Sequence, residues 1–208
     1  MTTAPREPAP PRDYRLLLPD GWFRIVLDPS EERERSIDAL VERQFEGIDN
    51  APHLKDDLRK DLRRRSAKAA RSGGIELYLS LQQVGPFTIP ASLLVTLAPL
   101  QHPGPLPAQA LAEALAADGG EATVSIEELP AGEAVRVRRL TTQPKPERER
   151  DTDAAPNGSH RSLSVEYHVP VPGTTAFLLL TFSTPLEPIA DAMAELFDAV
   201  AGSLTWTE

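Results

Sequence analysis

The chain has 208 residues, contains no cysteine and carries a formal net charge of −9 at pH 7. The missing cysteine excludes disulfides, thiolate metal sites and cysteine nucleophiles, and the negative charge argues against a surface that coats nucleic acid or anionic lipid as a whole. Hydrophobic residues make up 40% of the chain and aromatic residues 5%, which is leaner than an average globular domain but richer than a disordered chain.

The first thirteen residues contain four prolines among small and charged side chains, so residues 1–13 are predicted to form a disordered leader. They lack the apolar core of a signal peptide. The longest apolar runs of the chain are far shorter than the roughly 20 residues of a membrane-spanning helix. We therefore expect a cytoplasmic protein that has no membrane partner.

Turn residues and apolar periodicity divide the next part of the chain into a strand hairpin and two helices. Strands over 14–18 and 22–27 flank Pro19-Asp20-Gly21, in which the proline presets φ and the glycine accepts a positive φ, so a hairpin is predicted. An acidic helix from Ser30 to about residue 47 and a basic helix over 52–72 follow, and Gly73-Gly74 ends the second one.

The remaining elements are mostly strands. Residues 75–81 alternate with apolar odd positions, which predicts one buried face, and residues 89–97 form the next strand. A helix over 108–117 precedes a hairpin that turns at 129–132, with Val135 and Val137 inward and Arg136 and Arg138 outward beside Glu127. A charged, proline-containing flexible loop over 142–161 leads to strands over 163–169 and 176–182 and a last helix after Pro185.

Strands that come in pairs and helices that come in blocks predict an α+β fold, with a mainly antiparallel sheet packed by helices. Residues 14–208 are expected to form a single domain, because no linker separates two self-sufficient apolar cores.

No catalytic or ligand-binding signature is present in the sequence. The four histidines have no metal-ligand spacing, such as two histidines at i and i+4. There is no Gly-x-Ser-x-Gly motif, and Gly73-Gly74 follows a helix, whereas a phosphate-binding loop precedes one. No catalytic, cofactor-binding or metal-binding residue is therefore predicted, and we expect neither an enzyme nor a cofactor.

The charge of the second helix stands out from the rest of the chain. Between Lys55 and Arg71, eight Lys and Arg residues accompany three Asp residues, so this segment carries +5 and the other residues together carry −14. Two interpretations stay open: a docking surface for a protein partner with an acidic surface, or a solvated face whose arginines pair with the acids of the preceding helix. The candidate partner-binding residues are Arg59, Arg63, Arg64, Arg65, Lys68 and Arg71.

The serial order of several short motifs resembles a known family. A Pro-Asp-Gly-Trp turn precedes a Leu-Pro-Ala-Gly-Glu-Ala-Val-Arg-Val hairpin, a Leu-Leu-Leu-Thr-Phe-Ser-Thr strand and a helix over 193–200, with Trp206 near the end. From about Tyr14 to Trp206 this pattern is similar to the small PsbP-like α/β proteins of actinobacteria, some of which lie in ESX (type VII) secretion loci. The resemblance contains no catalytic motif, and it implies a non-enzymatic interaction or scaffold domain that serves a secretion system in the cytoplasm.

Two other functions remain alternatives. One is a small-molecule-binding protein or enzyme that uses a groove between sheet and helices. The other is a nucleic-acid-associated protein that uses the Arg-rich helix 52–72. Nucleic acid is disfavoured because no aromatic residue interleaves the arginines and the rest of the chain would repel phosphate.

Overall fold

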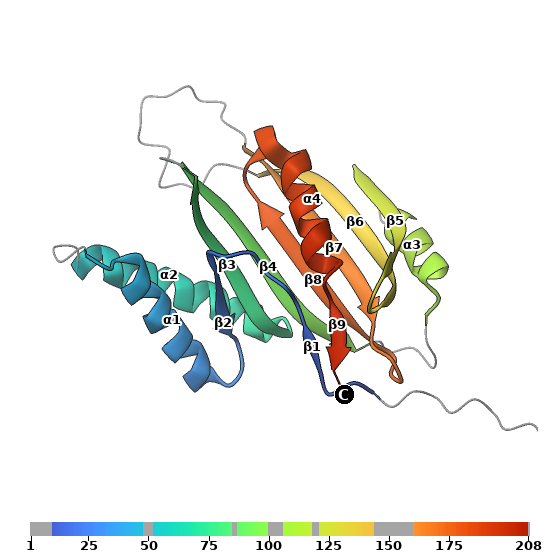
Figure 1. Cartoon of the computed structure of the whole chain (residues 1–208), viewed down its shortest axis with the longest axis horizontal. Helices are drawn as coiled ribbons and strands as arrows, with labels where there is room; N and C mark the ends of the chain where they lie inside the picture. Colours follow the sequence, from blue (N-terminus) through green and yellow to red (C-terminus); the bar gives the residue numbers. More distant parts are fainter. Residues whose placement is uncertain are drawn as a thin grey trace, which may run out of the picture. The chain divides into compact units, whose positions relative to one another are not determined.

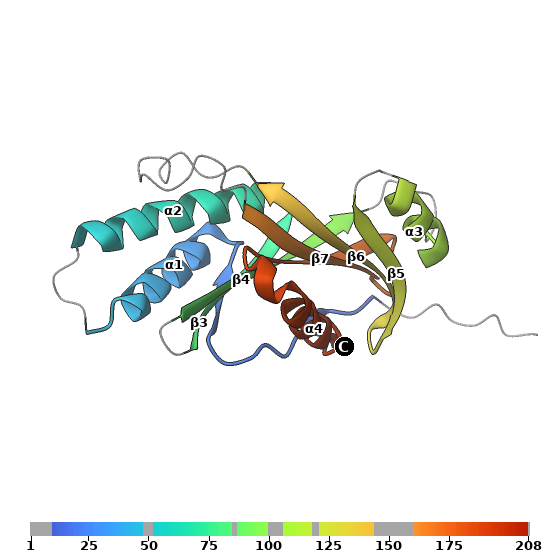
Figure 2. The same ribbon diagram turned by 90° about the horizontal axis from the view of Figure 1, so that it is seen from above.

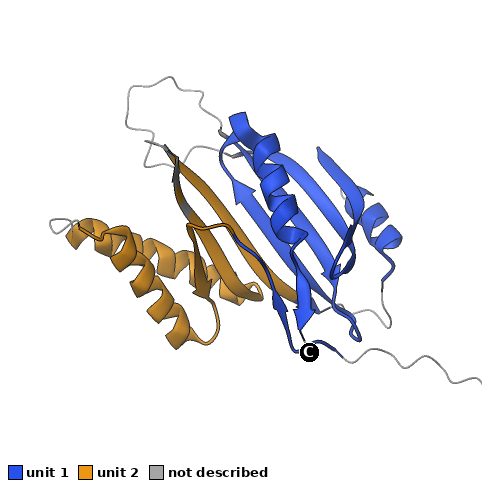
Figure 3. Ribbon diagram, viewed as in Figure 1, with its two compact units in different colours: residues 1–18, 98–208 blue, residues 19–97 orange. Residues whose placement is uncertain are grey.

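The structure is a computed structural model, which describes residues 10–47, 52–84, 87–99, 106–117, 121–143 and 160–207. The chain forms two compact units (Figure 3): unit 1 comprises residues 1–18 and 98–208, and unit 2 comprises residues 19–97. Each unit combines antiparallel strands with α-helices, so the predicted α+β class with mainly antiparallel sheet is confirmed. The single domain over 14–208 remains a prediction.

Unit 2 is a three-stranded antiparallel sheet that carries two helices. Its strands lie in the order β2-β3-β4, and the two helices connect β2 to β3 along the chain. The bounds of these elements are β2 (Trp22–Val26), α1 (Ser30–Gln44), α2 (Pro52–Arg71), β3 (Gly74–Val84) and β4 (Phe87–Pro99).

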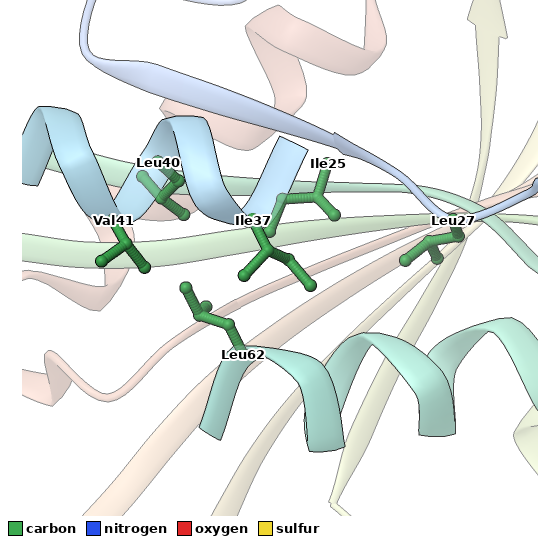
Figure 4. Packing of buried hydrophobic residues seen from close by; sticks show 6 residues of the cluster. All are labelled: Ile25, Leu27, Ile37, Leu40, Val41 and Leu62. Atoms are coloured by element: carbon green, nitrogen blue, oxygen red, sulfur yellow. The ribbon is translucent and has the colours of Figure 1, made fainter. Parts of the chain in front are cut away.

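The core of unit 2 lies between the two helices and one face of the sheet. Figure 4 shows Leu62 of α2 pointing toward Ile37 and Val41 of α1, with Ile25 and Leu27 of the β2 segment beside them. Leu77 and Leu79 of β3 pack against this cluster, as their apolar odd positions predict. The helices are thereby held on the sheet by their apolar sides, and their charged sides stay outside.

The opposite face of β3 is also partly buried, which its alternation does not predict. Glu76 and Ser80 are buried on that face. The guanidinium of Arg24 on β2 donates to the carboxylate of Glu76, and the hydroxyl of Tyr78 donates to it at 2.6 Å. An ion pair and a hydrogen bond therefore allow a carboxylate to be buried in the sheet.

Unit 1 contains a four-stranded antiparallel sheet in the order β5-β6-β7-β8 and a separate strand pair, β1-β9. Its helices α3 and α4 lie on opposite sides of the four strands (Figure 2). The bounds are β1 (Asp13–Arg15), α3 (Ala108–Ala117), β5 (Ala122–Leu129), β6 (Gly132–Gln143), β7 (His160–Pro170), β8 (Ala176–Thr184), a 3₁₀ turn η2 (Glu187–Ile189), α4 (Ala190–Ala201) and β9 (Thr205–Thr207).

The apolar core of unit 1 lies under α4, which crosses the strands β7 and β8 (Figure 1). The rings of Phe197 on α4 and Phe182 on β8 stack with centroids 4.9 Å apart, and both side chains are fully buried. Alternate residues of β7, among them Val165 and Tyr167, complete this face of the sheet. The buried alternate residues of the strands and the apolar stripe of α4 therefore pack against each other, as their sequence periodicities predict.

The predicted N-terminal hairpin is wrong. β1 pairs with β9, so that Tyr14 lies opposite Trp206, whereas β2 pairs with β3. Gly21 does adopt a positive φ of 87°, but β1 ends at Arg15 and never reaches that turn. Turn residues specify only where the backbone bends. Which strands pair depends on where another strand has hydrogen-bonding groups and side chains in matching register.

The hairpin of β5 and β6 is confirmed, with Leu129 opposite Gly132 and with Val135 and Val137 buried. The predicted loop 142–161 is too long, because the ladder between β6 and β7 continues to the pair Gln143 and His160. Main-chain hydrogen bonds extend such a ladder beyond its last buried side chains. Residues 144–159 of this loop and residues 1–9 of the predicted leader lie outside the described residues.

No helix within the described ranges has both the length and the hydropathy required to cross a bilayer.

Candidate interaction surface

The basic helix α2 extends from Pro52 to Arg71, within one residue of its predicted bounds. A narrow stripe attaches it to unit 2, because only Leu62 and Ser66 of this helix are buried while Leu58, Ala69 and Ala70 are partly covered. The rest of its circumference consists largely of charged side chains. The helix therefore owes its place to a few apolar contacts and presents most of its charge outside the core.

One flank of α2 faces the acidic helix α1 and is neutralised by it. The Nε atom of Arg59 donates to Asp38 at 2.8 Å, and the Nε atom of Arg63 donates to Glu34 at 2.5 Å. Lys55 donates to Glu42 at 2.9 Å. We call these three contacts the α1–α2 ladder; their direction shows that the two helices run antiparallel.

Arg59 is the most embedded cation of the ladder, with 21% of its side chain exposed. It also contacts Asp56 at 3.0 Å and Glu42 at 3.4 Å. The hydrogen bond to Asp38 raises the pKa of the guanidinium, against the opposing effect of burial. Of the six candidate residues, Arg59 and Arg63 therefore pair with acids of the preceding helix, which is what one of the two open interpretations predicts.

The other four candidates lie on the outer side of α2. Arg64 and Arg65 are 74% and 72% exposed, and both contact the same carboxylate, that of Asp61, within their own helix. Lys68 and Arg71 are exposed and make no ion pair within the part of the chain that the structure describes. This side of α2 thus keeps an excess of positive charge.

The outer cations follow the geometry of one helix face. Lys60, Arg64, Lys68 and Arg71 are spaced at i, i+4, i+8 and i+11, which places them within a sector of about 80° around the helix and along roughly 16 Å of its length. We call these four residues the outer stripe. Lys60 was not among the predicted candidates, although its spacing from Arg64 would have identified it.

A second polar cluster lies in unit 1, where it joins α4 to the sheet. Arg136 of β6 donates to both carboxylate oxygens of Asp198 at 2.8 and 3.0 Å, and the hydroxyl of Tyr167 donates to Asp198 at 2.7 Å. Arg138 pairs with Asp191, also on α4. The predicted pairing of these arginines with Glu127 is wrong, because α4 covers their face of the sheet and brings its own acids to it.

The pKa values of this cluster reflect burial and charge. Burial, and then the bond to Asp198, raises the pKa of Tyr167 far above its usual range. Burial by itself would lower the pKa of Arg136, but the contact with Asp198 outweighs it and the pKa is raised. These shifts keep the hydroxyl neutral and the guanidinium charged, so the cluster acts as a fixed structural contact.

His168 and Glu166 occupy the other face of β7, with Nε2 of His168 at 2.6 Å from Oε1 of Glu166. The contact with His168 lowers the pKa of Glu166 against the effect of burial, helped by Arg139 and by the hydroxyl of Thr181. Two neighbouring positions on one strand face bring them together. Within the described ranges, no group of three or more His, Asp or Glu residues has the arrangement of a metal site.

Comparisons with known proteins add one structural likeness. No protein-family model matches the chain, and no curated protein matches it. The chain is similar to the solution structure of cyanobacterial PsbP (CyanoP) from Synechocystis sp. PCC 6803, with 13% sequence identity and a TM-score of 0.41 over 93% of this chain and 86% of that chain. The likeness concerns the fold alone, and no role of that protein is transferred to this chain.

Proposed function

We propose that this protein is a non-catalytic interaction domain that binds an acidic protein surface through the outer side of α2. The proposal rests on the difference in ion pairing between the cations on the two sides of this helix. The flank toward α1 is paired with carboxylates. On the outer side, Arg64 and Arg65 pair with Asp61 of their own helix, and Lys68 and Arg71 are exposed without an ion pair to any described residue.

The contacts that Arg64 and Arg65 make with Asp61 do not prevent a partner from binding. Pairs of this kind, exposed and spaced at i, i+3 or i, i+4, contribute about 0.3–0.5 kcal/mol each. A partner carboxylate can therefore replace Asp61 at Arg64 or Arg65 at a small cost in free energy. The replacement is favoured where the partner carboxylate loses less water on pairing or contacts two cations at once. The outer stripe is therefore accessible both sterically and energetically.

The resemblance to PsbP-like proteins of actinobacterial secretion loci suggests where such a partner is found. We propose a cytoplasmic accessory role in a secretion system, in which the acidic partner is a component or a substrate of the apparatus. The genes beside this one test that assignment: a secretion ATPase or a gene for a small helical-hairpin substrate supports it, and their absence in every genome that carries the chain contradicts it.

The interaction itself is tested by affinity capture with charge-reversed variants. The wild-type chain and the variant Lys68→Glu/Arg71→Glu are each immobilised and exposed to nuclease-treated lysate of the source organism, and bound proteins are quantified by mass spectrometry. We expect one or a few acidic proteins that the wild type retains and the variant loses. Proteins retained equally by both would show that the outer stripe is not the binding surface.

The matched control is Arg35→Glu/Arg43→Glu, which changes the net charge by the same amount. Both pairs are exposed. Lys68 and Arg71 both lie in the last turn of α2, whereas Arg43 alone of the control pair lies in the last turn of α1. The α2 variant therefore opposes the helix dipole at one more position, and thermal unfolding of both variants verifies that each stays folded. Capture that survives the control variant and not the α2 variant assigns binding to the outer stripe.

A further inference from the structure

The α1–α2 ladder shows which kind of surface the cations of α2 accept. Glu34, Asp38 and Glu42 are spaced four residues apart on α1, and their partners on α2 are Arg63, Arg59 and Lys55, also four apart. Four residues of an α-helix rise by about 6 Å, so carboxylates and cations with equal spacing meet pairwise when two helices lie antiparallel.

The outer stripe repeats this spacing on another side of α2. Lys60, Arg64 and Lys68 are four residues apart, and Arg71 follows three residues later. At 100° per residue the centres of the two cationic stripes are about 140° apart around the helix, so a helix seated on the outer stripe would not collide with α1. The same helix thus offers one stripe that a helix already fills and a second one of matching geometry.

An apolar side chain lies near one end of the outer stripe. Leu54, in the first turn of α2, is 50% exposed. It lies six residues before Lys60 and about 80° around the helix from the centre of the outer stripe. Covering the exposed half of this side chain would remove apolar surface from water, which stabilises a complex. A docked helix that also covers Leu54 therefore gains an apolar contact as well as charge pairs.

The composition of α2 favours a protein partner over a nucleic acid. Residues 52–71 contain no Phe, Tyr or Trp, so the helix has no platform on which bases could stack. Asp57 and Asp61 interrupt the positive charge and would repel a continuous phosphate backbone. A helix with separate carboxylates can avoid these positions, because its charges are spaced like those of α1.

From these observations we infer that the partner presents an acidic amphipathic helix with carboxylates at i, i+4 and i+8. This helix lies along the outer stripe in the way that α1 lies along Lys55, Arg59 and Arg63. This inference rests on the proposed function and adds the shape and spacing of the partner's surface.

The test uses the full-length protein and two designed peptides of identical composition. Both are alanine-based helices with four Glu residues and two Leu residues; in the first the Glu residues follow one face at four-residue spacing, and in the second they are distributed around the helix. Binding is measured by fluorescence anisotropy at 150 mM NaCl, with a single-stranded oligonucleotide and polyglutamate as further probes. Circular dichroism confirms that the two peptides are equally helical.

We expect the peptide with aligned carboxylates to bind at least about tenfold more tightly than the peptide with distributed ones. Lys68→Glu/Arg71→Glu should weaken its binding by about tenfold or more, and the neutral variant Lys68→Gln/Arg71→Gln by less. The control Arg35→Glu/Arg43→Glu should leave it within about twofold. Thermal unfolding of each variant verifies that the fold is retained.

The outcomes separate this inference from the proposed function. Equal binding of both peptides, with loss in the α2 variant, overturns the helical partner but leaves the acidic-surface proposal standing. Tighter binding of the oligonucleotide than of either peptide overturns both in favour of nucleic acid. Failure of the peptides and of polyglutamate to bind overturns both as well.

Discussion

Asp198 has the largest share of polar contacts between α4 and the sheet of unit 1. It accepts two hydrogen bonds from Arg136 and one from Tyr167, and the Arg136 side chain is only 13% exposed. Asp198→Asn removes the charge that compensates this guanidinium. We expect a loss of about 1–3 kcal/mol in the free energy of unfolding, less than for a fully buried pair because the Asp198 side chain is 39% exposed.

Urea denaturation measures this loss, and Asp191→Asn serves as the matched control. Asp191 lies on the same helix and pairs with Arg138, but its side chain is 87% exposed, so its change should stay within about 0.5 kcal/mol. Equal effects of the two substitutions would contradict the structural role given to the Arg136–Asp198–Tyr167 cluster.

Because of Glu166, the folding stability of the protein should decrease as the pH falls in the acidic range. The pKa of its carboxyl is lowered in the folded state, first by His168, so the unfolded state binds more protons as the pH falls below the usual range of a glutamate. The stabilisation by Glu166 is therefore complete above about pH 5 and declines with acidification through the folded-state pKa. Glu166→Gln should destabilise the protein at pH 6 and much less at pH 3.5.

Denaturation midpoints of wild type and Glu166→Gln across this pH range provide the measurement. The difference between the two proteins must shrink on acidification. A difference that is constant or grows as the pH falls would show that the charge of Glu166 does not stabilise the folded state.

At the scale of elements, the junction between α2 and β3 depends on two glycines with different roles. Gly73 has a φ of +83° and ends the helix, as the sequence predicts. Gly74 begins β3, and a Cβ placed on it would lie 2.8 Å from the carbonyl oxygen of Ala69 and 2.9 Å from methyl carbons of Leu27 and Leu94. This glycine is needed for close packing of the helix on the sheet.

Gly74→Ala should therefore destabilise unit 2 by about 1–3 kcal/mol through overpacking. Gly73→Asn is the control, because asparagine tolerates a positive φ and a Cβ at this position makes only ordinary contacts, the nearest at 3.5 Å. Thermal unfolding followed by circular dichroism distinguishes them, and an alanine at 74 that leaves the midpoint unchanged would disprove the close approach.

The elements that could be predicted are those defined by neighbouring residues. The β5–β6 hairpin followed from its turn and its alternating valines, and the bounds of α2 and α3 followed from proline and glycine at their ends. The pairing of β1 with β9 joins residues about 190 positions apart, and nothing in either short segment specifies the other.

The same limit applies to the candidate surface. The charge of α2 was evident from composition, and its pairing with α1 was one of two open interpretations. Which cations are paired depends on the rotation of α2 about its axis, which Leu62 and Ser66 fix by their burial against the core. The sequence predicts Arg136 on the solvent-facing side of its hairpin, because nothing in the sequence indicates that α4 covers this face of the sheet.

For the whole molecule, the positive helix belongs to a protein of net charge −9. A partner with an acidic surface is repelled by the total charge and attracted by the outer stripe. The two effects differ in range, because the Debye length is about 30 Å at 0.01 M salt, about 8 Å at 0.15 M and about 3 Å at 1 M. The salt concentration therefore determines whether an approaching partner responds mainly to the net charge of the protein or to the local charge of the outer stripe.

The rate of association with an acidic helical peptide should accordingly pass through a maximum as salt increases. At 0.01 M the repulsion from the whole protein slows the encounter, near 0.15 M the local attraction dominates, and at 1 M both are screened. Stopped-flow fluorescence with the aligned peptide measures this rate constant. The variant Lys68→Glu/Arg71→Glu should instead show a rate that only rises with salt, because the two new carboxylates cancel the charge of Lys60 and Arg64 and leave the repulsion by the net charge dominant. A wild-type rate that falls steadily from the lowest salt would mean that the net charge plays no part in the encounter.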